Sequence, residues 1–211
     1  MQTAALEALA KLREGNRRFV AGETSGDGLA HYARRAELVS GQEPFAIVLG
    51  CSDSRVPAEI VFDQGLGDLF VIRVAGNVVF PSQVGSVEFA AERFHTRLVI
   101  VLGHSQCGAV AAALEQARQP ADSTSQTLRS IIERIRPAVM PLLQTEVAND
   151  PEALYREAVR ANVRLAADHL RHGSYVLERL IEEDGLVVVG AEYSLETGVV
   201  HIFDAPAAPE R

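Results

Sequence analysis

The chain has 211 residues, a net charge of −8 and a hydrophobic fraction of 47%. This length predicts a single domain over residues 1–211 with a core of ordinary size, and the excess of acidic side chains gives no electrostatic support for binding to nucleic acid. No apolar run is long enough to span a membrane, and the N-terminus lacks the basic and apolar regions of a secretory signal, so we expect a cytoplasmic protein without membrane contacts.

In chain order, residues 1–40 are predicted to form an N-terminal helical arm, with helices over 3–20 and 30–39. The apolar residues that mark one face of the first helix are Leu6, Leu9, Leu12 and Phe19. Short apolar runs predict strands at 45–50, 69–74, 98–103, 186–191 and 199–203. Further helices are expected at 57–64, 83–95, 105–118, 125–136, 138–146, 151–171 and 174–184, with a polar turn at 120–125 and a flexible tail at 205–211.

This alternation of strands and helices predicts an α/β fold. A mainly parallel central sheet is expected, flanked by helices on both faces. The turn signal at 196–198 predicts that the last strand returns antiparallel, as the second half of a C-terminal hairpin.

The only two cysteines follow two of the predicted strands. Cys51 comes directly after the strand at 45–50, and His104 and Cys107 come after the strand at 98–103. In open α/β sheets, ligands bind outside the carboxyl ends of the strands. Two thiolates and one imidazole make a three-ligand zinc set that leaves a fourth tetrahedral position for water, which is typical of a catalytic site.

Each of these residues also has an ordinary structural interpretation. A lone cysteine is most often a small buried hydrophobe, and a lone histidine often hydrogen-bonds its neighbours. A disulfide between Cys51 and Cys107 would need a secreted chain. The short spacing of His104 and Cys107, together with Cys51 in an equivalent loop, favours the zinc site over these alternatives.

A charged pair, Asp53 and Arg55, lies beside the first cysteine. It could be a surface ion pair of little energetic weight. Next to a zinc ion, however, Asp53 can either bind the metal and block its fourth position, or be held away by a two-pronged contact with Arg55. The second arrangement would free the position for water, whose pKa zinc lowers towards about 7, so that zinc-bound hydroxide can attack a substrate.

Two motifs resemble the signature motifs of the β-class carbonic anhydrases. They are Cys51-Ser52-Asp53-Ser54-Arg55 and Gly103-His104-Ser105-Gln106-Cys107-Gly108. Segments at 15–19, 73–77, 85–89, 188–193 and 197–198 are also similar to the family, so the resemblance covers nearly the whole chain. It implies a zinc enzyme that interconverts carbon dioxide and bicarbonate. One zinc per chain would be held by Cys51, His104 and Cys107, with Asp53 and Arg55 as the gating dyad.

The resemblance also implies a substrate pocket and an assembly. The residues at the family's pocket positions are Gln42, Phe70, Ala75, Phe89 and Gly108. Phe70 and Phe89 could equally be plain core residues, and Gln42 a loop residue. The family assembles from dimers with pockets at the subunit interface, so we expect a homodimer or a dimer-based tetramer. The N-terminal helix is a candidate for covering a partner surface.

The chain departs from the family pattern at two positions. Phe89 stands where many relatives have a tyrosine, so a hydroxyl group that could influence proton transfer or substrate preference is missing. Val48 stands where some bacterial relatives have a tryptophan of a non-catalytic bicarbonate site. We therefore do not expect that form of bicarbonate inhibition.

Two other functions remain open from the sequence. Relatives with the same ligands hydrolyse carbon disulfide or carbonyl sulfide, and access to the pocket would decide between these gases. The chain could instead be a non-catalytic zinc-binding protein, with Asp53 closing the site. A nucleotide-binding role is disfavoured, because Gly65-Leu66-Gly67 precedes a predicted strand where a phosphate loop would follow one.

Overall fold

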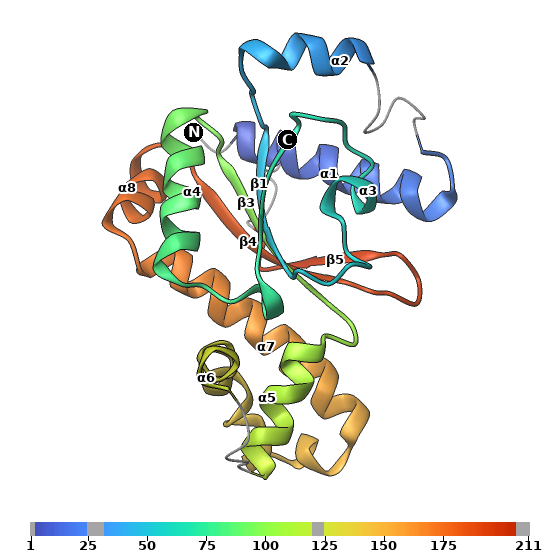
Figure 1. Ribbon diagram of the computed structural model, residues 1–211, viewed down its shortest axis with the longest axis vertical. Helices are drawn as coiled ribbons and strands as arrows, with labels where there is room; N and C mark the ends of the chain where they lie inside the picture. Colours follow the sequence, from blue (N-terminus) through green and yellow to red (C-terminus); the bar gives the residue numbers. More distant parts are fainter. Residues whose placement is uncertain (1–2, 25–31, 120–124, 206–211) are drawn as a thin grey trace.

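The computed structural model describes residues 3–24, 32–119 and 125–205. Five strands form one sheet in the order β2-β1-β3-β4-β5 (Figure 1). They are β1 (Ala46–Gly50), β2 (Leu69–Arg73), β3 (Leu98–His104), β4 (Val187–Tyr193) and β5 (Val200–Phe203). The first four strands are parallel and β5 pairs antiparallel with β4, which confirms the predicted α/β fold and its C-terminal hairpin.

Some of the helices pack on the two faces of this sheet, and others lie beyond its ends. They are α1 (Thr3–Ala21), α2 (Tyr32–Glu37), α3 (Ala58–Val61), α4 (Pro81–Arg93), α5 (Gly108–Arg118), α6 (Gln126–Val139), α7 (Pro151–His172) and α8 (Tyr175–Glu183). Short 3-10 turns occur at η1 (Leu38–Ser40), η2 (Ala75–Asn77), η3 (Leu142–Gln144) and η4 (Glu146–Asn149). Within the described part of the chain, no helix has the length and apolar character needed to cross a membrane.

The central strands are buried on both faces because each successive side chain points to the opposite side of the sheet. On one face, alternate residues of β1 and β3, such as Val48 and Ile100, pack with α1 and α3. On the other face, Ile47 and Val101 pack with α4, α7 and α8. This double cover explains why β1 and β3 read as continuous apolar runs in the sequence.

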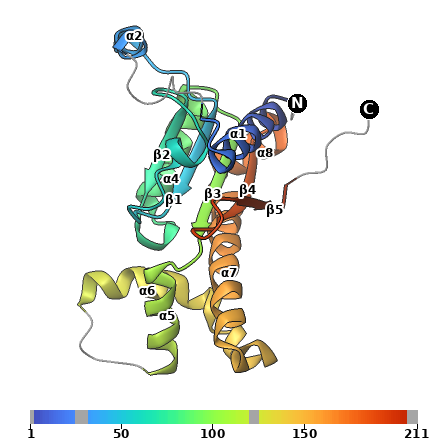
Figure 2. The same cartoon turned by 90° about the vertical axis from the view of Figure 1, so that its right-hand side faces the viewer.

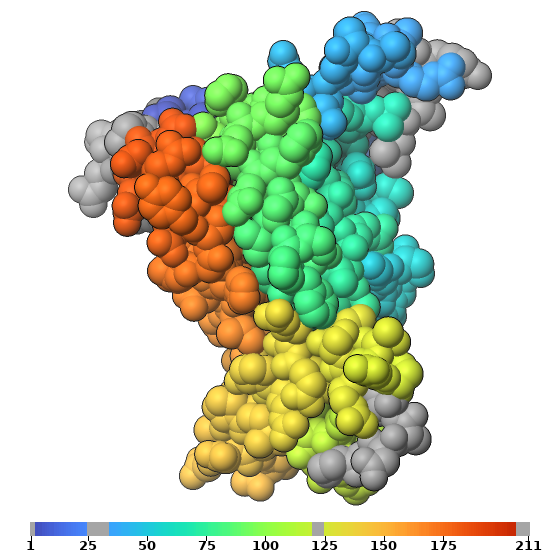
Figure 3. Space-filling model, turned by 60° about the vertical axis from the view of Figure 1, so that its left-hand side comes forward, coloured from blue at the N-terminus to red at the C-terminus, as the bar shows by residue number. Residues whose placement is uncertain are grey.

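Beyond the carboxyl ends of the strands lies a small helical lobe formed by α5, α6 and the N-terminal part of α7 (Figures 1 and 2). In space-filling view the lobe is set off from the body of the molecule by a narrowing (Figure 3). Its own apolar core includes Ile135, Leu154 and Val159, and it also contains Cys51 and Cys107. The two cysteines therefore lie where the sheet meets the lobe.

Helix α1 packs on the sheet of its own chain. Leu9 and Leu12 of its apolar stripe are buried in the core of that face. Asn16 donates hydrogen bonds to the carbonyls of Val61 (3.0 Å) and Gly198 (2.9 Å), which ties the helix to α3 and to the β4–β5 turn. Leu9 and Leu12 of the stripe are therefore covered within the chain, and a role of this helix in covering a partner surface stays a prediction.

Several helix boundaries differ from those predicted. The helix expected at 57–64 ends at Val61, since Asp63 adopts a positive φ of 46°. Helix α6 continues through Pro137 to Val139, although proline lacks the amide donor that a helix turn normally uses. The buried residues on either side of Pro137 keep this last turn helical by their packing. The helix expected at 138–146 is replaced by the short turns η3 and η4.

Helix α5 begins at Gly108, so Cys107 directly precedes its first turn and is not part of it. Two other expectations fall largely or wholly outside the described residues. Residues 120–124 of the predicted polar turn and residues 206–211 of the predicted tail are not described.

Candidate metal centre

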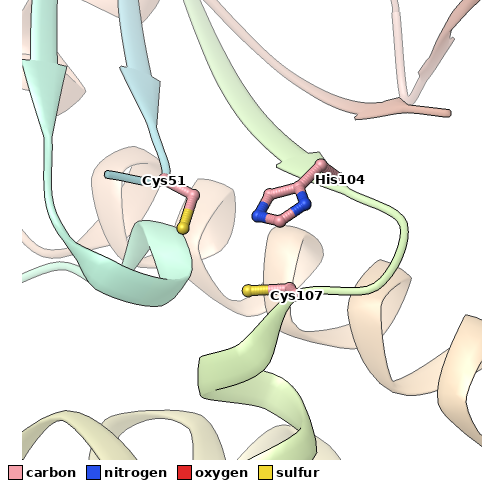
Figure 4. A group of neighbouring side chains, drawn as sticks. All are labelled: Cys51, His104 and Cys107. Atoms are coloured by element: carbon pink, nitrogen blue, oxygen red, sulfur yellow. The ribbon is translucent and has the colours of Figure 1, made fainter. Parts of the chain in front are cut away.

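Three potential metal ligands converge at the carboxyl end of the sheet. Cys51 follows β1, His104 ends β3, and Cys107 precedes α5, and their side chains point towards one another (Figure 4). Their ligand atoms all lie within 4.8 Å of one another, and the three residues are at most 5% exposed. Because β1 and β3 are parallel neighbours, their ends deliver these side chains to one place.

The orientation of His104 is set by the residue that follows it. Its Nδ1 atom lies 2.8 Å from the backbone carbonyl of Ser105, and a carbonyl can only accept, so Nδ1 carries the proton. The lone pair is then on Nε2, which is fully buried and has no hydrogen-bond partner among the described residues. A histidine oriented by a carbonyl with its other nitrogen free is the usual state of a metal ligand.

The two thiols complete this donor set. Both cysteines are free, and the contact between their thiols lowers the pKa of Cys51 and raises the pKa of Cys107. The two sulfur atoms are therefore close enough for both to contact one cation. Two thiolates and one imidazole that converge in a buried place fit zinc, which takes sulfur and nitrogen ligands.

Neighbouring backbone and side-chain groups fix the thiol-bearing segments. The amide of Gly76 donates to Cys51 Sγ at 3.3 Å, and Arg73 Nε donates to the Cys51 carbonyl at 3.1 Å. The hydroxyl of Tyr155 on α7 donates to the Cys107 carbonyl at 2.7 Å. Burial raises the pKa of Tyr155 to about 12, so this hydroxyl remains a donor throughout the physiological range.

Asp53 and Arg55 form the two-pronged contact expected from the sequence. Arg55 Nε donates to Asp53 Oδ1 at 2.9 Å and Arg55 Nη2 donates to Oδ2 at 2.7 Å, while the Arg55 amide also donates to Oδ1. These contacts hold the pKa of Asp53 well below its usual range. The carboxylate also lies beside the ligand set, since its Oδ2 is 3.8 Å from His104 Nε2.

Two further contacts hold this loop in place. Arg73 Nη2 donates to the Asp53 carbonyl at 2.6 Å, and Arg55 Nη2 also lies 3.3 Å from the carbonyl of Gln106. The second contact joins the loop after β1 to the loop after β3. The gating pair and the ligand loop are therefore parts of one hydrogen-bonded unit.

The predicted pocket residues separate into two groups. Ala75 begins the η2 turn whose next amide contacts Cys51, and Gly108 is exposed, with open space where a Cβ would stand. Both therefore lie at the site of their own chain. Gln42 precedes β1, at the opposite end of that strand from Cys51, which corresponds to roughly 17 Å of extended chain.

Phe70 and Phe89 also lie away from the ligands of their own chain. Phe70 pairs with Ile47, four residues and about 13 Å of strand before Cys51. Its ring contacts those of Phe89 and Phe94 at centroid distances of 6.2 and 6.0 Å. Phe89 is 54% exposed despite its size. Within a single chain, this aromatic cluster does not line the metal centre.

Three residues that support the site have no assigned role in the sequence interpretation: Arg73, Tyr155 and Glu196. Arg73 lies in a predicted strand and Glu196 in a predicted turn, and neither position by itself indicates a contact with the site. Tyr155 and Glu196 are 48 and 90 residues from the loop residues that they contact, so no local spacing could have revealed them.

Comparisons with known proteins agree with this geometry. The carbonic anhydrase family model matches residues 46–200. Carbonic anhydrase 2 of Mycobacterium tuberculosis is 39% identical over 187 residues, which cover 89% of this chain and 87% of that protein. The structure of the β-carbonic anhydrase CcaA is 27% identical and superposes with a TM-score of 0.73, covering 93% of this chain and 95% of that one.

Structures of tetrameric β-carbonic anhydrases from Sordaria macrospora show the same fold. Their TM-score is 0.72 at 24% identity, and the match covers 82% of this chain and 87% of that one.

Proposed function

The chain belongs to the β-class carbonic anhydrases, and we propose that it catalyses the zinc-dependent, reversible hydration of carbon dioxide to bicarbonate and a proton. The observation that carries this proposal is the convergence of Cys51, His104 and Cys107 beside the Asp53–Arg55 pair. The first three residues supply a cation site, and the pair supplies the means to keep one side of that site open.

We propose that Cys51, His104 and Cys107 hold one zinc ion per chain. Zinc bound there supplies a Lewis acid that makes water ionise near neutral pH. The protein's part is to keep both thiols as thiolates and to hold the imidazole with Nε2 facing them. The Ser105 carbonyl, the Gly76 amide and the Tyr155 hydroxyl serve these purposes. A reducing compartment such as the cytoplasm would keep the thiols available.

Asp53 is proposed to act as the gate. Held by Nε and Nη2 of Arg55, its carboxylate stays beside the ligands and would leave one side of a bound metal open. There the carboxylate can accept a hydrogen bond from the attacking water and so orient that water towards carbon dioxide. Released from Arg55, the same carboxylate would bind the metal and would close the site.

The substrate pocket is proposed to form between subunits. Ala75 and Gly108 would line it from the chain that holds the zinc. Gln42, Phe70 and Phe89 lie too far from their own chain's ligands, so they could line only a neighbouring chain's pocket. This arrangement supports a homodimer or a dimer-based tetramer, and the related Sordaria macrospora enzymes are described as tetrameric.

Replacing Cys107 by alanine tests the proposed function. We expect wild-type protein to carry about one zinc per chain and to hydrate carbon dioxide, and Cys107→Ala to lose most of both together, because a two-ligand site cannot retain the metal. Cys107→Ser should also lose zinc, since a hydroxyl stays protonated. Metal analysis and stopped-flow hydration on the same samples measure this. Full zinc occupancy in Cys107→Ala would overturn the ligand assignment.

The same assay separates the alternatives. Phe89 in place of a tyrosine removes a hydroxyl from the proposed pocket, which could favour carbon disulfide or carbonyl sulfide, so turnover on all three gases should be compared. If turnover is fastest on carbon disulfide or carbonyl sulfide, the chain is a hydrolase of that gas and carbon dioxide is not its main substrate. Bound zinc without turnover on any gas would support a non-catalytic zinc-binding protein.

A further inference from the structure

The turn between β4 and β5 holds the loop that carries two of the proposed zinc ligands. In this turn, the Glu196 carboxylate accepts a hydrogen bond from Ser105 Oγ at its Oε2 atom, and one from Gln106 Nε2 at its Oε1 atom, both at 2.8 Å. Leu195 donates its amide to Ser105 Oγ at 2.9 Å. Ser105 and Gln106 are the only residues between His104 and Cys107.

Each of these two loop residues in turn orients a group of the site through its backbone carbonyl. The carbonyl of Ser105 accepts the Nδ1 proton of His104 at 2.8 Å, which sets the direction of the imidazole. The carbonyl of Gln106 accepts from Arg55 Nη2 at 3.3 Å, on the guanidinium that holds Asp53. One carboxylate therefore reaches both halves of the site, one oxygen atom for each half.

The loop needs such support because its backbone is not in a relaxed conformation. Gln106 has a φ of 55°, in the left-handed region that a residue with a side chain rarely adopts. Such conformations persist where the surroundings fix them. Ser194 also donates to Glu196 Oε2 at 3.0 Å, and the hydrogen bond from Ser105 is the largest cause that lowers the pKa of Glu196. The carboxylate is therefore ionised and fixed at neutral pH.

We propose that Glu196 is a positioning residue that sets the orientation of both His104 and Arg55 through the Ser105–Gln106 loop. It touches neither substrate nor metal. The effect of Glu196 on catalysis depends on the proposed Asp53–Arg55 gate. Its effect on the position of the ligand loop does not depend on that gate. Loss of Glu196 would let the loop relax, misalign the imidazole and weaken the contact between Arg55 and Gln106.

Three variants of the full-length, zinc-loaded protein test this role. Glu196→Ala removes both anchors. Glu196→Gln keeps one oxygen and replaces the other by an amide nitrogen, which cannot accept, so it retains only one of the hydrogen bonds from Ser105 and Gln106. Thr197→Ala is the matched control, because its hydroxyl accepts from the Val199 amide within the same turn and has no contact with the ligand loop.

We expect Glu196→Ala to release zinc to a chelator about tenfold faster than wild type, in line with the usual effect of losing a group that orients a metal ligand. Hydrogen exchange of residues 105–107 should also be faster. In hydration assays kcat should fall by about tenfold while KM changes little. Glu196→Gln should lie between Glu196→Ala and wild type, and Thr197→Ala should match wild type in every readout.

The readouts separate this proposal from the proposed function. Zinc release and hydrogen exchange do not depend on turnover, so they decide the role of Glu196 in the loop even if the wild type hydrates no carbon dioxide. Equal behaviour of Glu196→Ala and Thr197→Ala in zinc release and exchange would overturn the proposal. An unfolding temperature lowered in Glu196→Ala without faster zinc release at 25 °C would also overturn it, because the residue would then serve the fold alone.

Discussion

The pair formed by Asp53 and Arg55 shows how two exposed-loop residues acquire a specific role from their surroundings. As a surface ion pair it would contribute little. Here, however, the carboxylate is 18% exposed, receives three hydrogen bonds from one residue and lies 3.8 Å from His104 Nε2. Its geometry corresponds to the open state of the proposed gate.

We predict that Arg55→Ala retains its zinc but loses at least about tenfold in hydration rate, because Asp53 then loses the two-pronged contact that holds it away from the metal. Arg55→Lys should recover only part of the rate, since an ammonium group cannot make the planar two-pronged contact. Zinc content and stopped-flow rates measure both variants. Near-normal turnover in Arg55→Ala would show that this pair is not the gate.

The lowered pKa of Asp53 determines the pH range in which protonation can break its contact with Arg55. A carboxyl whose pKa is depressed in the folded state keeps its stabilising contact above the ordinary value of about 3.9, and loses it only as the pH falls through the lowered value. Protonation of Asp53 therefore cannot break the Asp53–Arg55 contact in an assay between pH 6 and 9. A rate that rises over this range must reflect another ionisation, such as that of the attacking water.

At the scale of elements, the close approach of α1 to α3 depends on one glycine. A Cβ on Gly15 would stand 1.8 Å from the Phe62 carbonyl oxygen, and a backbone atom cannot move aside easily. We predict that Gly15→Ala destabilises the protein by about 1–3 kcal/mol, as is usual for overpacking. Urea unfolding measures this effect.

Gly85 provides the matched control for that variant, because it lies inside α4 and a Cβ there would meet nothing within 4 Å. Gly85→Ala should be neutral or stabilising by up to about 1 kcal/mol, through helix propensity alone. Equal effects of the two substitutions would contradict the packing described for α1.

The elements that position the site were largely predictable from sequence, for a physical reason. β1 and β3 are apolar on both faces, so they could only be central strands, and that places Cys51 and His104 at one edge. The helix boundaries in the lobe were less predictable: packing of Ile135 and Val139 carries α6 past Pro137, and this packing involves residues distant in sequence. The contacts made by Tyr155 and Glu196 could not be predicted for the same reason, because they also join residues that are distant in sequence.

At the scale of the whole molecule, the exposed Phe89 supports the proposal that another chain covers this surface. A phenylalanine that is 54% exposed, beside Phe70 and Phe94, is costly to leave in water. We predict a solution mass of two or four times the chain mass of 22.8 kDa, measured by light scattering. Phe89→Ser should shift the protein towards smaller species and lower its activity, whereas a monomeric wild type with full activity would contradict the shared pocket.

The most direct test of the central claim is stopped-flow hydration of carbon dioxide as a function of pH, on protein whose zinc content is measured on the same sample. The account predicts about one zinc per chain and a rate that is low in mildly acidic solution and rises towards alkaline pH. Protein with full zinc occupancy that hydrates no carbon dioxide at any pH would contradict the account.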